Sequence, residues 1–451
     1  MSEYLKEALW IADLTVNKLA DENLLLPKRI DAQSGEIIEP ERMIDDLGDY
    51  VQYIWYLGKT LGNQRLMDFA FSSALNAARL YQDKSGLFKG AFREDSRIDW
   101  YSNEDVFVGL TSLYRLSKDR RLEDIIFRFQ HGIEMYLHQS GFLFAGRRGF
   151  LKYISVPPKA FVEGLVHVYL TNGNRETLEL AKRLTEPWIH LGFFKRHGIF
   201  PSRILNIGWL YNMNDSMHRY KLRNLRLLGE CGIPKTNTNF LQGILELWNV
   251  TEDKIYEDSM RRWIDTAERD LIKNDLYAAS YNVYSKGWSF HNKTIIPLIS
   301  VLAFYADFCK SFGDERVLSI LEQRVKKFLQ LQAETGFFRD APHDPKDPKY
   351  NRGFLDCQTD MSVLLLKLYC LTKNKLYLES AGRCIDSVIR YLKRPSGYIE
   401  YFNVSTGSAE HHSRMYVKFF TLFMKALILL DAVLSGRDIY EDELLIIAAD
   451  R

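Results

Sequence analysis

Acidic and amide residues recur near the starts of several apolar segments of this chain. Asp49, Asp105, Asn239 and Asp360 occupy nearly the same place in four of these segments. Acids that are brought together from separate segments raise one another's pKa, which suits a general acid paired with a general base. The alternative is helix capping, because Asp and Asn side chains accept hydrogen bonds from free backbone N–H groups. Both interpretations place these residues at helix starts.

Further acids stand beside this set. Glu104 and Asp356 lie in the approaches to two of the apolar segments, and residues 45–49 (Asp-Asp-Leu-Gly-Asp) spell DDxxD. Terpene synthases bind Mg²⁺ and diphosphate with that pattern, but short motifs produce many false matches. No second metal motif accompanies it, and the acids precede a helix rather than lying within one. We therefore expect neither a metal nor a cofactor, and a Mg²⁺-dependent terpenoid enzyme stays an alternative.

Two histidine segments and several aromatic residues lie in the same approaches. His291 and the pair His411-His412 precede the fifth and seventh apolar segments, where Ser413 or Arg414 takes the place of the recurring acid. Aromatic rings stack on the C–H faces of sugars, and they serve equally well to anchor loops. The aromatics in question are Trp100, Tyr101, Trp288, Tyr398 and Tyr401. Phe88 belongs to a recurring strand signature, so we expect it to be structural.

Seven apolar helices must position these residues. Their sequences are apolar nearly all round, which is typical of helices buried on more than one side. Short polar turns follow the first six, and each leads to a more amphipathic helix, for example at 65–80 or 377–392; the N-terminal helix at 3–20 is the seventh of this outer type. The expected inner helices span 48–62, 103–119, 158–174, 238–253, 293–314, 358–374 and 413–430. The stretch 97–124 shows the repeated unit most clearly.

The connections from each outer helix back to the next inner helix are long. Most begin with a signature such as SGLF (85–88) or SGYIEYF (396–402), in which a Gly is expected to end the outer helix and a small hairpin to follow. Since all inner helices run the same way, these connections fall at the inner-helix N-termini. Long ordered loops gathered at one end usually carry function. Helix N-termini also favour acidic or polyhydroxyl ligands.

The repeated pair with its SG-apolar-Phe return resembles the α/α toroid. That superfamily includes the six-hairpin glycosidases, uronyl hydrolases, polysaccharide lyases and sugar 2-epimerases. The resemblance implies an all-α fold of class (α/α)6–7 in one domain, residues 1–451, with small β-hairpins at the inner-helix N-termini. It also implies a cleft there, lined by acids, His and aromatics. Seven pairs resemble the class I mannosidases and the lanthionine cyclases, but the zinc-binding Cys and His pattern of the cyclases is missing.

These residues predict a carbohydrate-active enzyme, with glycoside hydrolysis first and a carbohydrate as its substrate. Asp105 and Asp360 are expected to be the main acid/base pair. The supporting residues are Asp46, Asp49, Glu104, Asp356 and His412, and the substrate-binding residues are Trp100, Tyr101, Trp288, His291, Asn239, Tyr401 and Arg414. His-dependent sugar epimerisation or polysaccharide cleavage by a lyase is the runner-up. A non-catalytic glycan-binding module stays open as well.

Charge and cysteine content indicate which binding partners and which cellular compartment to expect. The net charge of +2 comes from 60 basic and 58 acidic residues without a basic run, so a nucleic-acid partner is not expected. The five cysteines form no CxxC, and most lie in apolar helical patterns as buried thiols do. The N-terminus is no signal peptide, and the apolar stretch 416–434 is interrupted by charges, so a cytoplasmic protein without membrane contact is expected. The polar segment 339–353 is a solvated loop, a lid, or an arm to a neighbouring subunit in a homo-oligomer.

Overall fold

The structure is a computed structural model that describes residues 1–42, 44, 46–89, 100–144, 154–205, 234–273, 276–283, 285–289, 295–340, 351–409 and 413–445. The chain divides into two compact units. The first is built from Met1–Tyr81 and from Tyr305 onward, and the second lies between Gln82 and Phe304. The boundary between Phe304 and Tyr305 falls inside one helix, α12.

Every inner helix that the sequence predicts is present, and each begins within four residues of its predicted start. Buried side chains lie on nearly all sides of these helices, as their uniform apolar sequences require. The inner helices are α2 (Leu47–Leu61), α4 (Trp100–Ser117), α6 (Ala160–Asn172), α10 (Pro234–Thr251), α12 (Ile295–Phe312), α14 (Leu355–Thr372) and α16 (Val417–Leu434).

The outer helices are amphipathic. In α3, for example, Leu66, Phe69, Ala70 and Ser73 are buried at helical spacing while the opposite face carries charges. The outer helices are α1 (Glu3–Leu14), α3 (Gln64–Tyr81), α5 (Glu123–Met135), α7 (Arg175–Ile189), α11 (Lys254–Asp270), α13 (Glu315–Leu329) and α15 (Lys375–Leu392). Helix α1 continues into a π-helical turn, η1 (Thr15–Leu19), and α5 follows a 3₁₀ turn, η2 (Arg120–Leu122). A short extra helix, α8 (Gly192–His197), follows α7.

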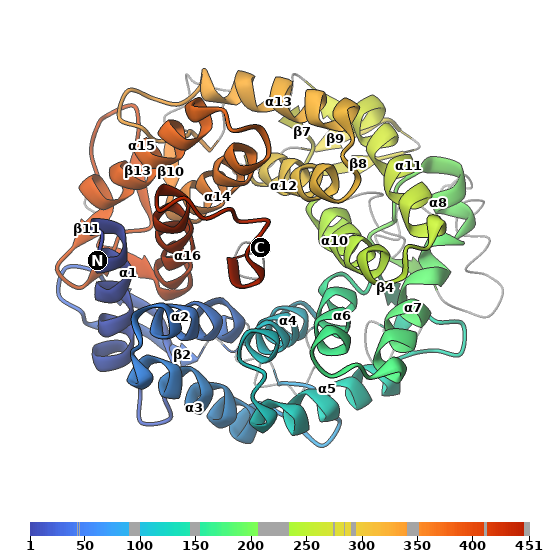
Figure 1. Ribbon diagram of the computed structural model, residues 1–451, viewed down its shortest axis with the longest axis horizontal. Coiled ribbons are helices and arrows are strands. Elements are labelled where there is room, and N and C mark those ends of the chain that lie inside the picture. The colour runs from blue at the N-terminus through green and yellow to red at the C-terminus, as the bar shows by residue number, and fades with distance from the viewer. Residues whose placement is uncertain are drawn as a thin grey trace. The chain divides into compact units, whose positions relative to one another are not determined.

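In the first unit, the last inner helix lies among helices from the start of the chain. Helix α16 packs against the inner helices α14 and α2, and it takes α1 as its outer partner (Figure 1). Helix α2 packs on α3, and α14 packs on α15. In the second unit, α6 packs between α4 and α10 and against its outer partner α7. Inner helices that are distant in the sequence therefore present their starts to one another within each unit.

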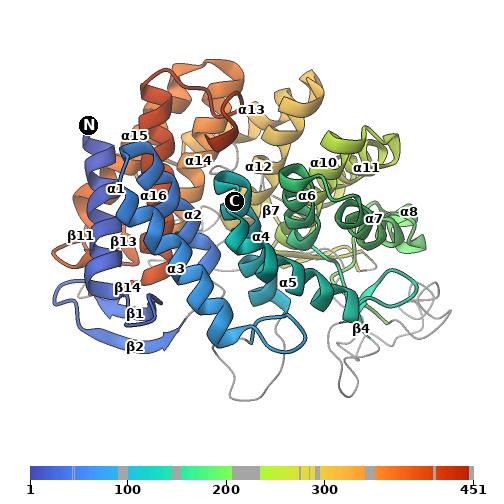
Figure 2. The ribbon, with the colours of Figure 1, turned by 60° about the horizontal axis from the view of Figure 1, so that its bottom comes forward.

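Short strands occupy the connections from outer to inner helices. The largest group, β1 (Pro27–Asp31), β2 (Ile37–Arg42) and β14 (Arg414–Tyr416), forms an antiparallel sheet at one end of α1 and α16 (Figure 2). The other strands are β3 (Leu143–Phe144), β4 (Ile154–Val156), β5 (Ile204–Leu205), β6 (Ile272–Lys273), β7 (Leu276–Tyr277), β8 (Ser280–Asn282), β9 (Gly287–Ser289), β10 (Arg352–Phe354), β11 (Lys393–Arg394), β12 (Gly397–Tyr398) and β13 (Tyr401–Asn403). Predicted hairpins are present as β1–β2 and β11–β12, and as β6–β7 and β8–β9 in the return that lacks the Gly, whereas the described parts of the returns at 85–88 and 335–338 have single bridges.

The recurring Gly lies in a tight turn rather than at the end of the outer helix, so that part of the prediction is wrong. Helix α3 ends at Tyr81, and Gly86 sits five residues later with φ +88° between the bridged residues Gln82 and Phe88. The same turn recurs at Gly141 and Gly336. The positive φ that Gly supplies is needed to reverse the chain immediately after the helix.

One side-chain contact fixes the returns to the inner-helix starts in three places. The amide at the fourth residue of α4, α10 or α14 accepts a hydrogen bond from the backbone N–H of a Phe in the preceding return and donates one to its C=O. The pairs are Asn103 with Phe88 (2.7 and 2.8 Å), Asn237 with Phe200 (3.0 and 3.1 Å) and Gln358 with Phe338 (2.8 and 2.8 Å). Phe88 is therefore structural, as expected.

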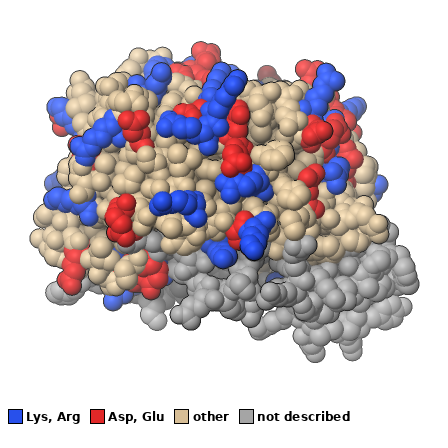
Figure 3. All heavy atoms as spheres, turned by 90° about the horizontal axis from the view of Figure 1, so that it is seen from below, with Lys and Arg blue, Asp and Glu red and all other residues tan. Residues whose placement is uncertain are grey.

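The surface and the thiols fit the expectations from composition. Figure 3 shows Lys and Arg side chains interspersed with Asp and Glu over the described surface of that face. Among the described cysteines, Cys309, Cys357, Cys370 and Cys384 are buried and free of disulfides. Helix α12 is the one described helix that is long and apolar enough to cross a membrane. Of its apolar stretch 67% is buried within the molecule, as in core helices, so this is weak evidence for a span.

Candidate active site at the starts of the inner helices

In the first unit, two predicted acids share one lysine. Lys418, the second residue of α16, places its Nζ 3.1 Å from Asp46 Oδ1 and 2.9 Å from Asp49 Oδ2. The side chains of Asp46 and Asp49 are only 7% and 18% exposed, and that of Lys418 is 22% exposed. Asp46 precedes α2, yet its side chain makes no capping hydrogen bond. Capping therefore does not explain Asp46, because its carboxylate is directed at the neighbouring helix.

Helix α14, on the other side of α16, contributes two more predicted acids. Asp356 Oδ1 accepts a hydrogen bond from the backbone N–H of Cys357 at 2.9 Å, a local contact of the first turn. Asp360 is the sixth residue of α14 and is half-buried. A capping residue sits just before the first turn, so Asp360 lies too far along the helix to cap it.

Two predicted substrate-binding residues, Tyr401 and Arg414, lie on strands that lead into this region. Strand β13 pairs with β10, and the guanidinium of Arg352 stands 4.5 Å from the centre of the Tyr401 ring. That cation–π contact covers one face of the ring, which supports a role for Tyr401 in anchoring β13. Arg414 is exposed on β14, opposite Asp31 of β1.

The second unit has its own carboxylate–lysine pair at the helix starts. Lys159 Nζ donates to Glu104 Oε2 at 2.8 Å, and the two side chains are only 6% and 5% exposed. Lys159 precedes α6 with φ +33° and ψ −118°, a backbone conformation that non-glycine residues rarely adopt. Strain of this kind persists only where the surroundings hold it, and it is concentrated at functional sites.

Asp105 and Asn239 occupy matching positions in the second unit. Each is the sixth residue of its helix, α4 and α10, and each is half-buried. Neither is a cap, for the same positional reason as Asp360. Both helices pack on α6, which carries the buried Glu163 in its first turn. The capping alternative thus fails for three members of the recurring set: Asp105, Asn239 and Asp360. Asp49 lies earlier, as the third residue of α2, so it is out of register with them.

Of the remaining predicted residues, one makes a structural contact, and the side chains of the others lie outside the described residues. Trp288 donates its indole N–H to the carbonyl of Asp270 at 3.0 Å and stands under Lys273, so it anchors the β8–β9 hairpin. Trp100 and Tyr101 form the first turn of α4, and their side chains are outside the described residues. His291 and His412 are outside them too, as are Asp45, His411 and most of 339–353.

The sequence analysis missed Lys159 and Lys418. A signal for both was available, because a lysine at a helix N-terminus faces the positive end of the helix dipole and is unfavourable there without an acidic partner. Lys159 is the second residue of the predicted inner helix 158–174, and Lys418 is the sixth residue of the predicted helix 413–430. Each of them could therefore have been matched to the acids at neighbouring helix starts.

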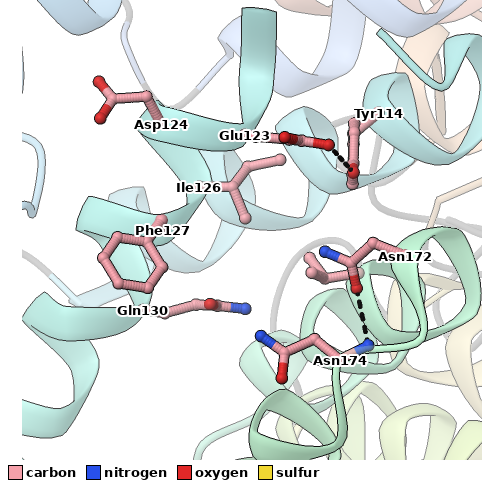
Figure 4. Close-up of a pocket in the computed structure, with 9 residues that line it drawn as sticks. Tyr114, Glu123, Asp124, Ile126, Phe127, Gln130, Asn172 and Asn174 are labelled. Carbon is pink, nitrogen blue, oxygen red and sulfur yellow. Dashed lines mark hydrogen bonds between the residues drawn. The ribbon is translucent and has the colours of Figure 1, made fainter. Parts of the chain in front are cut away.

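An open pocket lies elsewhere in the second unit. It has a volume of about 450 Å³ and is lined by residues of α5 and of the C-terminal ends of α4 and α6, including Tyr114, Glu123, Phe127 and Asn172 (Figure 4). It contains none of the predicted catalytic residues. Within the described part of the chain, no three His, Cys, Asp or Glu side chains lie close enough together to hold a metal ion.

Comparison with known proteins defines the class of fold. No protein-family profile and no curated protein sequence matches this chain. Many solved structures do resemble it. A D-mannose isomerase is 12% identical with a TM-score of 0.55, over 96% of this chain and 98% of that protein. A glycoside hydrolase family 76 mannosidase from Bacteroides thetaiotaomicron is 8% identical with a TM-score of 0.54, over 97% and 100%.

A cellobiose 2-epimerase from Bacillus thermoamylovorans is 14% identical with a TM-score of 0.51, over 82% of this chain and 99% of that protein. At such identities the likeness shows the fold. The chain has the all-α fold of helix hairpins known as the α/α toroid, as the recurring helix pairs predicted.

Proposed function

We propose that this protein is a carbohydrate-active enzyme, and specifically a glycoside hydrolase that uses paired carboxylates at the starts of its inner helices. The observation that carries the proposal is the position of Asp105 and Asp360. Each lies in the second turn of an inner helix, half-buried and beyond the reach of a capping role. Glycosidic cleavage needs one carboxyl group to protonate the leaving group and another to activate water or attack the sugar.

A solved structure of the same fold supports this chemistry. An α-1,6-mannanase from Salegentibacter, 9% identical with a TM-score of 0.51, is described as inactive when two successive aspartates are replaced by asparagine. The present chain has one pair of successive aspartates, Asp45-Asp46, immediately before the first inner helix. Asp46 belongs to the cluster with Asp49 and Lys418. We therefore keep Asp46, Asp49, Glu104 and Asp356 as supporting acids.

Variants of the two acids test the proposal. A screen of aryl glycosides and of α- and β-linked oligosaccharides first identifies a hydrolysed substrate. Asp105→Asn and Asp360→Asn are then expected to lower kcat by about 10²–10⁴, the usual contribution of a general acid or base. The melting temperature should stay nearly unchanged, because Asn has the size of Asp. Asp258→Asn, an exposed acid on the outer helix α11, is the matched control and should retain full activity.

Full activity of both variants, or the absence of hydrolysis with every glycan, would contradict the proposal. Since solved structures of this fold also include an isomerase and epimerases, His291→Ala and His412→Ala should be measured in parallel. Loss of sugar epimerisation in these two variants alone would establish the epimerase in place of the hydrolase. A cytoplasmic location belongs to the same proposal and is supported by the four cysteines that the structure describes, which are buried and form no disulfide.

A further inference from the structure

A pocket with mixed polar and aromatic lining lies at the end of the second unit opposite the inner-helix starts. Its walls come from the C-terminal parts of α4 and α6, from the outer helix α5 and from the first residue before α7. Its volume of about 450 Å³ is within the range of small-molecule sites, about 300–1,000 Å³. Asp105, one of the acids proposed for catalysis, lies near the other end of α4, so this pocket is a separate feature.

The amide groups of the pocket are turned toward one space. Figure 4 shows the side chains of Gln130, Asn172 and Asn174 around the same opening. The Asn172 oxygen already accepts the backbone N–H of Asn174 at 3.0 Å, and the Asn174 oxygen accepts that of Glu176 at 2.9 Å. The local turns thus use the two oxygens and orient the two NH₂ groups, which are hydrogen-bond donors, at the rim.

Acceptors and an aromatic ring complete the lining. Glu123 accepts the hydroxyl of Tyr114 at 2.7 Å, and its carboxylate has further lone pairs for a ligand. Arg128 pairs with Asp124 at 3.0 Å, so the charge of that second acid is offset. Phe127 is 67% exposed, the most exposed large apolar side chain in the described chain.

We propose that this pocket is a second saccharide-binding site. A sugar hydroxyl both donates and accepts hydrogen bonds, which matches amide donors beside a carboxylate acceptor. The C–H face of a sugar ring packs on an aromatic ring, which matches Phe127. A cationic ligand fits less well, because Arg128 pairs with Asp124 and the amides of Asn172 and Asn174 contribute donors, while the Gln130 NH₂ donates to Thr177 at 3.2 Å. The proposal shares its ligand class with the proposed function, but it depends on other residues.

Ligand-observed saturation-transfer NMR on the full chain tests the site, with D-mannose, cellobiose and α-1,6-mannotriose as probes. The measurements use the Asp105→Asn/Asp360→Asn background, so that turnover cannot consume the probes. Phe127→Ala is expected to weaken binding of at least one probe about tenfold or more, as truncation of an exposed aromatic anchor does. Phe127→Trp should retain binding, because it keeps an aromatic platform.

Two further variants sharpen the result. Asn172→Asp keeps the oxygen that accepts the Asn174 N–H but replaces the donor NH₂ with a carboxylate near Glu123, so it should also weaken binding about tenfold. Leu376→Ala removes an exposed apolar side chain from α15, in the other unit, and is the matched control that should bind as the background does. Equal saturation transfer in all variants, or none with any probe, would overturn the site. Retained hydrolysis by Asp105→Asn and Asp360→Asn would instead contradict the proposed function, and it would not affect the evidence for saccharide binding at this pocket.

Discussion

At the scale of single residues, each unit has acids at its inner-helix starts that contact a lysine on a neighbouring helix. Glu104 meets Lys159, and Asp46 and Asp49 both meet Lys418. The Glu104–Lys159 pair is almost fully buried, and the pairs of Lys418 are partly buried. Burying an ion pair costs desolvation energy, and removing one partner then leaves a charge that is poorly compensated.

The first prediction concerns Lys418. Lys418→Met removes the cation that Asp46 and Asp49 both contact, so the free energy of unfolding should fall by roughly 3 kcal/mol, the lower end of the range for a broken buried pair. Urea unfolding measures the loss. Lys6→Met, which removes an exposed partner of Glu3, is the control and should change stability by less than about 1 kcal/mol.

A double variant separates the ion pairs from simple packing. Adding Asp49→Asn to Lys418→Met removes one of the two repelling charges, so the double variant should be more stable than the sum of the single losses implies. Strict additivity would mean that the carboxylates and the lysine do not interact in solution. Such coupling is expected because the Nζ–Oδ distances are 3.1 and 2.9 Å.

The sequence predicted the acids at the inner-helix starts, but it did not predict the lysines that contact them. Acids at inner-helix starts could be found because helix register is a local property of the apolar pattern. The Asp46–Lys418 pair joins residues that are far apart in the sequence, so it depends on how α16 packs beside α2. No local pattern contains that information. The same limit explains why Trp288 was assigned to substrate binding although it anchors its own hairpin.

At the scale of elements, the return segments hold the inner-helix starts in place. A turn at a glycine reverses the chain after the outer helix and is followed by a Phe. A side-chain amide of the next inner helix then forms two hydrogen bonds with the backbone of that Phe. Glycine and aromatic residues revealed the returns in the sequence. The sequence did not reveal the amides at Asn103, Asn237 and Gln358 as a recurring contact, because their backbone partners lie 15, 37 and 20 residues earlier and no local pattern links them.

The second prediction compares two glycines of the second unit. A Cβ at Gly86 would collide with the backbone carbonyl of Arg128, which cannot move aside easily, and φ is +88° there. A Cβ at Gly173, where φ is +71°, would meet nothing within 4 Å. Gly173→Ala should therefore cost only about 1 kcal/mol, while Gly86→Ala should cost clearly more, since backbone displacement adds to the φ penalty.

Thermal unfolding of the two purified variants measures the difference. The melting temperature of Gly86→Ala should lie below that of Gly173→Ala, and equal melting temperatures would show that the turn yields without cost. Because Gly86 packs on the outer helix α5 rather than on the catalytic candidates, any loss of activity in Gly86→Ala should follow loss of folded protein.

At the scale of the whole molecule, the two ends of the chain are joined within the first unit. Helix α1 packs on α16, and β1 pairs with β14. Glu7 of α1 accepts hydrogen bonds from Lys393 at 2.5 Å and from Tyr398 at 2.6 Å, beside the β11–β12 hairpin. The sequence predicted α1 as an outer helix. Its packing on α16, the last inner helix, could not be predicted locally, because the two helices are far apart in the sequence.

Charges reinforce this junction on the strand side. Arg29 of β1 bonds Glu39 of β2 at 2.6 Å and Glu400, which directly precedes β13, at 3.1 Å. The hydrogen bond from Arg29 is the main cause that lowers the pKa of Glu39 below its ordinary value of 4.5, and Lys28 contributes as well. The pKa of Asp31 is also lowered, chiefly by the Ser413 hydroxyl, which comes from the opposite end of the chain.

The lowered pKa values of Glu39 and Asp31 determine how the stability of the junction should change with pH. A carboxyl group with a lower pKa in the folded state stabilises the fold above its unfolded pKa, and that contribution disappears as the pH falls through the folded pKa. Arg29→Gln should therefore lower the melting temperature at pH 7, and its difference from the wild type should shrink as the pH falls below 4.5, the ordinary value for Glu39. Melting curves from pH 7 to pH 3 measure this, with Lys6→Gln at an exposed pair as the control that should follow the wild type throughout. A difference that stayed constant or grew on acidification would mean that Arg29 stabilises the junction by packing on Tyr416, which lies 5.2 Å from its guanidinium, and not through Glu39.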